Sequence, residues 1–186
     1  MAAALTLKSA PTDSTVKTDA RAGKYLVFQL DREEFAIPVQ SVREILGMLE
    51  ITHVPQTPNF VKGVINLRGK VIPVVDLRLK FGMEAAASTR STSIIVVQVQ
   101  VVQAQGAQEN GPRTPLLMGV IVDAVAEVLA VAAADIEDTP SFGQEVAVPY
   151  VMGLAKIKGK VKILLDITQV LTTGELARLD FDAFSH

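Results

Sequence analysis

The sequence predicts an all-β fold of two small β barrels packed together, built by internal duplication, with short helices that include a C-terminal one. Short runs of branched apolar residues alternate with Gly, Pro or polar turns, as in β-rich proteins. Residues 61–77 match residues 151–167 without a gap, and residues 37–46 match 120–129 in the same order. Each copy spans about 65 to 80 residues with about five strands, which suits a small closed or partly closed barrel.

Both ends of the chain and one internal segment lack the pattern of a strand. Residues 1–24 are rich in Ala, Thr, Ser and Lys, with neither periodicity nor the apolar core of a signal peptide. We therefore predict a disordered N-terminal tail and a cytoplasmic protein. One domain is expected at residues 25–181, followed by a short C-terminal tail at 182–186. Residues 103–115 contain two Gly and two Pro, which predicts a flexible loop.

The strand assignments follow composition and the turn residues between the runs. The clearest strands are residues 25–30, 34–39, 64–67, 71–75, 94–102, 117–122 and 161–165. Residues 42–49 carry apolar side chains at helical spacing, yet a short run cannot be assigned by its period alone. We interpret that stretch as a turn running into a strand.

Glycine and aspartate mark the turns and the helix starts. Residues 68–69 and 158–159 are each a basic residue followed by Gly, and they lie between strand pairs, where Gly supplies the positive φ of a tight hairpin. Asp76 and Asp166 each follow a strand and are expected to N-cap a short helix. The capping-box pattern at residues 172–175 predicts the C-terminal helix, which should run to about residue 181.

The duplication points to the part of the surface that carries function. The approximate repeat blocks are residues 37–78 and 120–167, and the longer gapless match has six identical positions and six conservative ones. Because apolar character recurs where a strand would face a core, chance is a poor explanation. Two similar halves leave a seam, and surfaces that bind partners tend to form at seams. We therefore expect the function there.

Composition excludes several classes of protein. With 186 residues, 49% apolar side chains and a mean hydropathy of +0.33, the chain can bury a sizeable core. A net charge of −2 provides no positive field toward nucleic acid. The absence of cysteine excludes disulfides, zinc knuckles, iron–sulfur ligation and thiol catalysis. The longest apolar stretch is interrupted by Asp123 and Glu127, so we predict no membrane insertion.

The chain shows no catalytic pattern of residues. Its two histidines are His53 and His186, and no cluster of histidines or carboxylates has the spacing of metal ligands. Asp76 and Asp166 are repeat-equivalent and follow strands, which favours capping over paired acid catalysis. The glycines form neither a Walker loop nor a dinucleotide-binding loop. We therefore predict that the protein is not an enzyme and binds no metal and no cofactor.

The first copy resembles a known family. Residues 25–28, 35–39, 42–45 and 60–78 read YLVF, FAIPV, VREI and FVKGVINLRGKVIPVVDLR, and together they resemble the CheW family of bacterial chemotaxis coupling proteins. The sharpest part is the Asn-Leu-Arg-Gly hairpin, between Lys-Gly-Val and Pro-x-x-Asp-Leu-Arg. The resemblance covers residues 25–181. It implies two SH3-like five-stranded β barrels, in agreement with the duplication.

The resemblance also implies a function and partners. It implies a non-enzymatic scaffold that couples the cytoplasmic tip of methyl-accepting chemotaxis receptors to the regulatory domain of a CheA-type histidine kinase. Such a protein works in receptor arrays at the inner face of the membrane. The same resemblance allows a CheW-like adaptor of a pathway whose output is pilus motility or another response. The receptor and its signal stay open.

By resemblance, four residues fall on or beside the receptor-binding surface: Val39, Val42, Glu44 and Arg68. We expect Glu44 and Arg68 to form an ion pair at the surface. For Val39 and Val42 an alternative stays open. Their repeat partners are valines too, which favours a purely structural role for both in the core. The second copy has Ala126 in place of Arg43 and Lys158 in place of Arg68. The receptor site is therefore expected on one barrel, which leaves the other for the kinase.

Two other classes of function fit less well. A small β-barrel protein that binds nucleic acid needs a basic face rich in aromatic rings, but aromatic residues make up 5% of the chain and Trp is absent. A small enzyme would need a pocket in which His53 or an acid has a strongly perturbed pKa. A pocket of that kind is the observation that would favour an enzyme.

Overall fold

The computed structural model describes residues 19–102, 112–139 and 149–172, and most of them lie in two mixed sheets. The six-stranded sheet contains β1 (Gly23–Leu30), β2 (Glu33–Pro38), β8 (Ala124–Val131), β9 (Ile136–Glu137), β10 (Val151–Ile157) and β11 (Lys160–Leu165). The five-stranded sheet contains β3 (Val42–Gly47), β4 (Val61–Leu67), β5 (Lys70–Asp76), β6 (Ser93–Val102) and β7 (Arg113–Val122). The helical elements are η1 (Val39–Ser41), α1 (Leu77–Lys80), η2 (Ala133–Asp135) and α2 (Ile167–Thr172).

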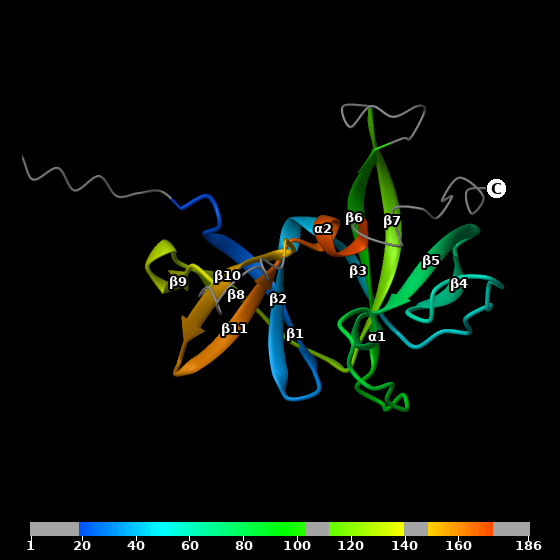
Figure 1. The fold of residues 1–186 in the computed structure, drawn as a ribbon, viewed down its shortest axis with the longest axis horizontal. Helices are drawn as coiled ribbons and strands as arrows, with labels where there is room; N and C mark the ends of the chain where they lie inside the picture. The colour runs from blue at the N-terminus through cyan, green and yellow to red at the C-terminus, as the bar shows by residue number, and fades with distance from the viewer. Residues whose placement is uncertain (1–18, 103–111, 140–148, 173–186) are drawn as a thin grey trace, which may run out of the picture.

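The two sheets curl into two small barrels that lie side by side, with α2 between them (Figure 1). We call the five-stranded sheet barrel 1, with strand order β3-β6-β7-β5-β4, and the six-stranded sheet barrel 2, with order β8-β1-β2-β11-β10-β9. In barrel 1 the segment after β3 returns to β4 through a bridge between Thr52 and Val64. The predicted all-β fold of two packed barrels with short helices is confirmed.

The barrels do not coincide with the two sequence copies, because the copies exchange hairpins. β2 of the first copy runs parallel to β11 of the second, with Ala36 opposite Leu164. β7 of the second copy runs parallel to β5 of the first, with Gly119 opposite Val74. These two contacts are repeat-equivalent in the sequence. Each barrel therefore combines the leading hairpin of one copy with the remaining strands of the other.

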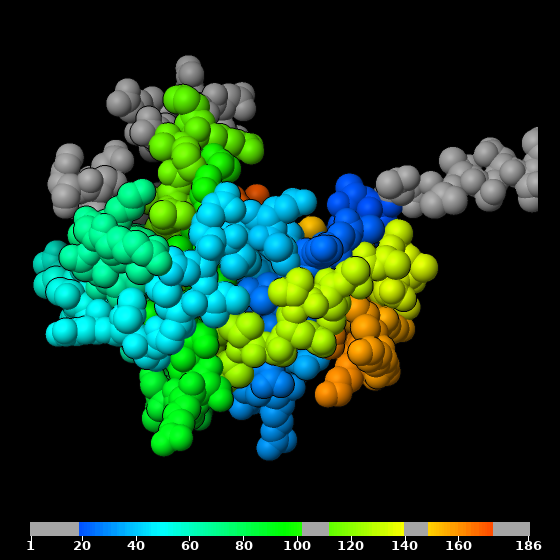
Figure 2. Space-filling view, turned by 180° about the vertical axis from the view of Figure 1, so that it is seen from behind, coloured from blue at the N-terminus to red at the C-terminus, as the bar shows by residue number. Residues whose placement is uncertain are grey.

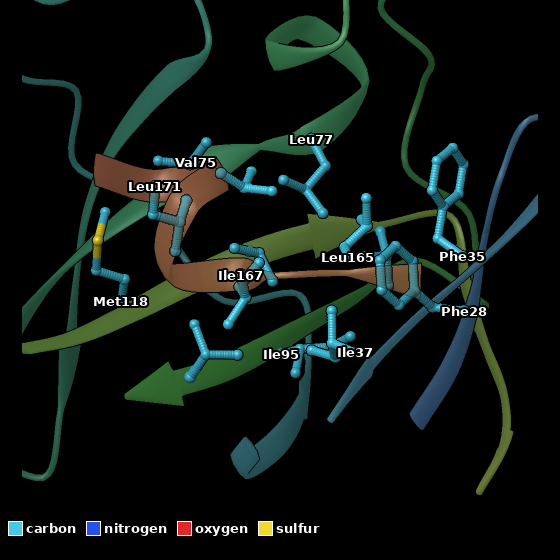
Figure 3. Packing of buried hydrophobic residues seen from close by; sticks show 14 of the residues in the cluster. Phe28, Phe35, Ile37, Val75, Leu77, Ile95, Met118, Leu165, Ile167 and Leu171 are labelled. Carbon is cyan, nitrogen blue, oxygen red and sulfur yellow. The ribbon is translucent and has the colours of Figure 1, made fainter. Parts of the chain in front are cut away.

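The largest apolar core lies between the barrels, and both contribute to it. Figure 3 shows Ile167 and Leu171 of α2 packed in this core with side chains from strands of both barrels. Each barrel also has a smaller interior cluster of its own. The central core therefore joins the barrels into one unit and fills the seam predicted from the duplication. The labelled side chains of this core are Phe28, Phe35, Ile37, Val75, Leu77, Ile95, Met118, Leu165, Ile167 and Leu171.

Several local predictions are confirmed. The backbone N–H of Arg78 donates to Asp76 Oδ1 at 2.9 Å, so Asp76 caps α1. The N–H of Thr168 donates to Asp166 Oδ1 at 3.0 Å, and Asp166 caps α2 in the same way. For residues 42–49, interpreted as a turn running into a strand, only the strand is confirmed: β3 begins at Val42, and the turn, η1, lies before this stretch.

Other local predictions are wrong or incomplete. The loop predicted at 103–115 ends earlier, because residues 113–115 belong to β7 and pair with β6, Pro115 opposite Gln100. The long ladder between β6 and β7 outweighs the local turn preference of Pro. Residues 103–111 lie outside the described residues. The strand assignments also omitted β8, β9 and β10, of which β8 is rich in alanine and β9 has two residues.

The ends of the chain are described only in part. Of the predicted tail at 1–24, residues 1–18 lie outside the described residues, whereas β1 already begins at Gly23. Arg21 is held by Asp19 at 2.6 Å and by the carbonyl of Met152 at 2.8 Å, so this part of the predicted tail is bound to barrel 2. Thr172 is the last residue of α2, and its hydroxyl donates to the carbonyl of Thr168. The predicted C-terminal helix beyond Thr172 and the tail at 182–186 lie outside the described residues. Within the described residues, no helix has the length and apolarity to cross a membrane.

Candidate functional site

The hairpin between β4 and β5 ends in a tight turn whose geometry is held by its own residues. Arg68 and Gly69 have φ values of 51° and 84°, which is the type I′ turn that matches the twist of a hairpin. The side-chain oxygen of Asn66 accepts a hydrogen bond from the N–H of Gly69 at 2.9 Å. The turn therefore places the Arg68 side chain at the tip of barrel 1.

Arg68 and Glu44 form the ion pair that the sequence predicts. Arg68 Nη2 lies 2.5 Å from Glu44 Oε1, and Nη1 lies 2.9 Å from Oε2, so two parallel hydrogen bonds join the guanidinium and the carboxylate. The hydrogen bonds from Arg68 hold the pKa of Glu44 below its ordinary value, and those to Glu44 raise the pKa of Arg68. The Arg68 side chain is 72% exposed and that of Glu44 28%, so the cation faces outward.

A bulge in β3 orients the charged residues beside this pair. The register shifts between Val42, opposite Val97, and Glu44, opposite Val96, so Arg43 is the extra residue. The Arg43 side chain is exposed and is held by Gln98 Oε1 at 2.9 Å and by the carbonyl of Gln40 at 3.0 Å. β3 therefore presents a second exposed cation, held by Gln98 and Gln40, from the residue that precedes Glu44.

Val39 and Val42 lie at the border of the central core. Both are half-buried and pack against that core, Val39 from η1 and Val42 from β3. Their repeat partner Val122 is fully buried, whereas Val125 is half-buried. The structure thus places these two valines between the two interpretations drawn from the sequence, with part of each side chain accessible.

Sequence reasoning missed a set of exposed apolar side chains near the predicted site. Ile45 and Val71 are 46% and 37% exposed, on β3 and on β5 just after the Arg68 turn. Their repeat partners Val128 and Val161 are 55% and 49% exposed, so both copies expose the same two positions. The repeat alignment pairs these positions, but it does not distinguish exposed apolar residues from core residues. Met48 and Leu49, at 36% and 41%, extend the exposed apolar surface of barrel 1.

The two copies differ in their charges. The second hairpin has the same turn, with Lys158 at φ 51°, but Lys156 stands where the first copy has Asn66, and it pairs with Glu137 at 2.9 Å. Among the residues that the structure describes, Glu127, the repeat partner of Glu44, is in no ion pair.

The candidate site lies on one face of the molecule. In Figure 2, η1, β3 and the residues that follow lie in the middle of this face, between the β4–β5 region and β8.

The described residues also contain a small cavity, of about 80 Å³, beside α1. Two of its charged lining residues face each other, with Arg78 Nη1 3.3 Å from Asp123 Oδ2. Arg78 Nη2 also lies 3.4 Å from Asp31 in the β1–β2 turn, so this guanidinium links the two barrels. His53 is exposed and does not line the cavity. Within the described residues, no three His, Asp or Glu side chains gather where they could hold a metal ion.

Comparison with known proteins covers both barrels. Residues 24–175 match the family model of the CheW-like domain. The chain is 35% identical over 163 residues to the chemotaxis protein CheW of Klebsiella aerogenes, a match that covers 88% of this chain and 90% of that protein. It is 28% identical over 161 residues to protein FrzA of Myxococcus xanthus, with 81% and 86% covered.

The fold agrees with a solved structure as well. The crystal structure of scaffolding protein TtCheW from Thermoanaerobacter tengcongensis is similar with a TM-score of 0.66 and 32% sequence identity, over 83% of this chain and 95% of that one. The match to the family model and the relatives above 30% identity extend over both copies of the repeat. The chain therefore belongs to the CheW family and has its fold of two SH3-like barrels.

Proposed function

We propose that the protein is a non-enzymatic scaffold that couples the cytoplasmic tip of chemoreceptors to a CheA-type histidine kinase, and that barrel 1 binds the receptor. The observation that carries the site is the bidentate pair of Glu44 and Arg68 at a hairpin tip that a hydrogen bond to Asn66 closes. Membership of the CheW family and the similarity to the scaffolding protein TtCheW support the role of a scaffold.

The chemistry of this surface suits a helical partner. The half-buried Val39 and Val42, together with the exposed Ile45, offer apolar contact to the apolar face of a helix. The outward-facing guanidinium of Arg68 and the held guanidinium of Arg43 would fix the orientation of that helix through charge. Apolar contacts then supply affinity, and the charges supply specificity.

Barrel 2 is the proposed site of the kinase regulatory domain. It keeps the two exposed apolar positions, Val128 and Val161, but has no counterpart of the Glu44–Arg68 pair among the described residues. Two unlike surfaces on one rigid unit would let the protein hold two different partners at once. The shared central core supports such rigidity because it includes residues of both barrels.

Charge reversal tests the receptor site. We expect Glu44→Lys and Arg68→Glu each to weaken association with receptor-bearing membranes by about a hundredfold, because each reversal opposes a charge of the partner. Binding of the kinase should stay near wild type, since it uses the other barrel. The melting temperature should change little, because exposed ion pairs contribute little to stability. Co-sedimentation with the membranes and calorimetry measure these effects.

Two control variants sharpen the test. Glu127→Lys changes the exposed repeat partner on barrel 2 and should leave receptor binding intact. The double variant Glu44→Lys with Arg68→Glu restores an internal pair in the opposite sense and should still fail to bind the receptor. Recovery of binding by this double variant would assign the pair a purely internal role. An equal loss in Glu127→Lys would remove the receptor site from barrel 1.

A further inference from the structure

We infer that Asn66 is a positioning residue of the proposed receptor site, and that it acts by holding the hairpin tip from which Arg68 reaches Glu44. The inference rests on the proposed function of that site. Asn66 lies two residues before Arg68, and its side chain is exposed. It adds no packing to a core, so its contribution to the site comes from the hydrogen bond that it makes.

That hydrogen bond closes the turn from within. Asn66 Oδ1 accepts from the N–H of Gly69 at 2.9 Å, so the hydrogen bond spans Leu67 and Arg68. Arg68 has φ 51°, a left-handed conformation that a residue with a Cβ atom disfavours. The bond from Asn66 restricts the alternatives open to this strained residue. The bond thereby limits how far the Arg68 backbone can move away from this conformation, and with it the direction in which the Arg68 side chain leaves.

The ion pair with Glu44 requires that the Arg68 side chain be restricted in its direction. Two parallel hydrogen bonds, at 2.5 Å and 2.9 Å, require the plane of the guanidinium to align with the carboxylate. Arg68 is 72% exposed, so few neighbours restrain its side chain directly. A partner that recognises the aligned pair binds more tightly when the tip is already in place, because less conformational freedom is lost on binding.

The second copy provides an internal comparison. Its hairpin forms the same turn, with Lys158 at φ 51° and Gly159 at φ 75°, although Lys156 replaces Asn66 and points to Glu137 instead. An Asn at this position is therefore not needed for the turn to form. Within the described residues, the copy that has the Asn bond is also the copy that has the arginine–glutamate pair. This co-occurrence indicates a role in the site and not in folding.

Substitution at residue 66, with residue 156 as its matched control, tests the proposal. We expect Asn66→Ala to weaken receptor association about tenfold, the effect of a typical hydrogen bond, with a melting temperature close to wild type. Asn66→Asp keeps the acceptor oxygen and should bind within about threefold of wild type. Lys156→Ala should bind as wild type. The probe is the same receptor-bearing membrane, titrated at constant salt.

A double-mutant cycle separates positioning from a direct contact with the receptor. If Asn66 acts through Arg68, Asn66→Ala should weaken binding in the wild type but not in the Arg68→Ala background. An equal loss in both backgrounds, or wild-type binding of Asn66→Ala beside an impaired Arg68→Ala, would overturn the inference. If Arg68→Ala binds normally, the proposed receptor site fails, and the inference falls with it.

One measurement does not depend on the receptor. The order parameter of the Arg68 Nε–H group, measured by nuclear magnetic resonance, should fall in Asn66→Ala and be retained in Asn66→Asp. The Nε–H group of Arg43, which Gln98 holds separately, should be unaffected and serves as the internal reference. An unchanged order parameter of Arg68 in Asn66→Ala would overturn the inference whatever the binding data show.

Discussion

Replacing Lys162 by methionine should lower the free energy of unfolding by about 1.5 to 3 kcal/mol, because it removes the strongest partner of the half-buried Glu34 carboxylate, which keeps only Gln29 and the charge of Lys160. Lys162 is 4% exposed, and its Nζ lies 2.6 Å from Glu34 Oε2. The two residues face each other where β11 runs parallel to β2. The pair therefore joins the first copy to the second inside barrel 2.

Barrel 1 provides the matched control for this substitution. The repeat partners of Lys162 and Glu34 are Ile72 and Leu117, an apolar pair in place of the charged one. The double variant Glu34→Leu with Lys162→Ile copies that pair and should unfold at wild-type or higher free energy, because no charge is left buried alone. Urea unfolding followed by far-ultraviolet circular dichroism measures both. A double variant as unstable as Lys162→Met would show that packing, and not charge, causes the loss.

The same pair predicts a dependence on pH. The hydrogen bond from Lys162 holds the pKa of Glu34 below its ordinary value, against the opposing effect of burial. Because the folded-state pKa is lower than the unfolded one, this contribution to stability is complete above the unfolded-state pKa and is lost as the pH falls through the folded-state pKa. Wild type should therefore lose stability relative to the double variant below about pH 4.3. Unfolding curves of both proteins at pH 3 and pH 7, each about a pH unit or more from the ordinary pKa of Glu, check this.

Replacing Gly63 by alanine should cost more than about 4 kcal/mol and open barrel 1. A Cβ atom on Gly63 would lie 2.0 Å from the carbonyl oxygen of Thr52, closer than any real contact. Thr52 and Val64 exchange two backbone hydrogen bonds of 2.9 Å, which close the barrel. The new methyl group must push this closing segment away, because backbone cannot move aside as a flexible side chain can.

Gly69 is a control that separates two effects of an added Cβ atom: the steric collision and the cost of a positive φ. Gly69 also has a positive φ, 84°, but a Cβ atom there would meet nothing within 4 Å. Gly69→Ala should therefore cost only the backbone term, about 1 to 2 kcal/mol. Hydrogen exchange at the amides of Thr52 and Val64 should accelerate in Gly63→Ala and not in Gly69→Ala. Equal destabilisation of the two variants would contradict the role assigned to the close approach at Gly63.

Features set by neighbouring residues could be predicted from the sequence. Asp76 and Asp166 cap helices that begin one residue later, and the Arg68 turn depends on four consecutive residues, so the information lies in the local chain. The ion pair between Glu44 and Arg68 spans a longer separation, and it was expected through the family resemblance. Its physical basis, the bulge at Arg43 and the bond from Asn66, emerged only in the folded chain.

Exposure could not be predicted in this way. Ile45 is an apolar residue of a kind usually found in cores, yet its side chain is 46% exposed. β3 is an edge strand that pairs only with β6, and no described residue covers the Ile45 side chain. Arg113 and Pro115 looked like loop residues, and they became strand because β6 offered a ladder long enough to include them. Whether a side chain is covered, or a turn former is recruited into a strand, depends on partners distant in the sequence.

By itself, the sequence determined that the chain is a duplicated β protein of the CheW family with two equivalent hairpins, each with a basic residue at its tip. Only the tertiary structure decided which hairpin joins which barrel, because both copies carry the same apolar alternation. The alternative arrangement would place Glu34 against Ile72, and Lys162 against Leu117. The ion pair between Lys162 and Glu34 would then be lost, so the observed exchange of hairpins is favoured by the ion pair that it alone allows to form.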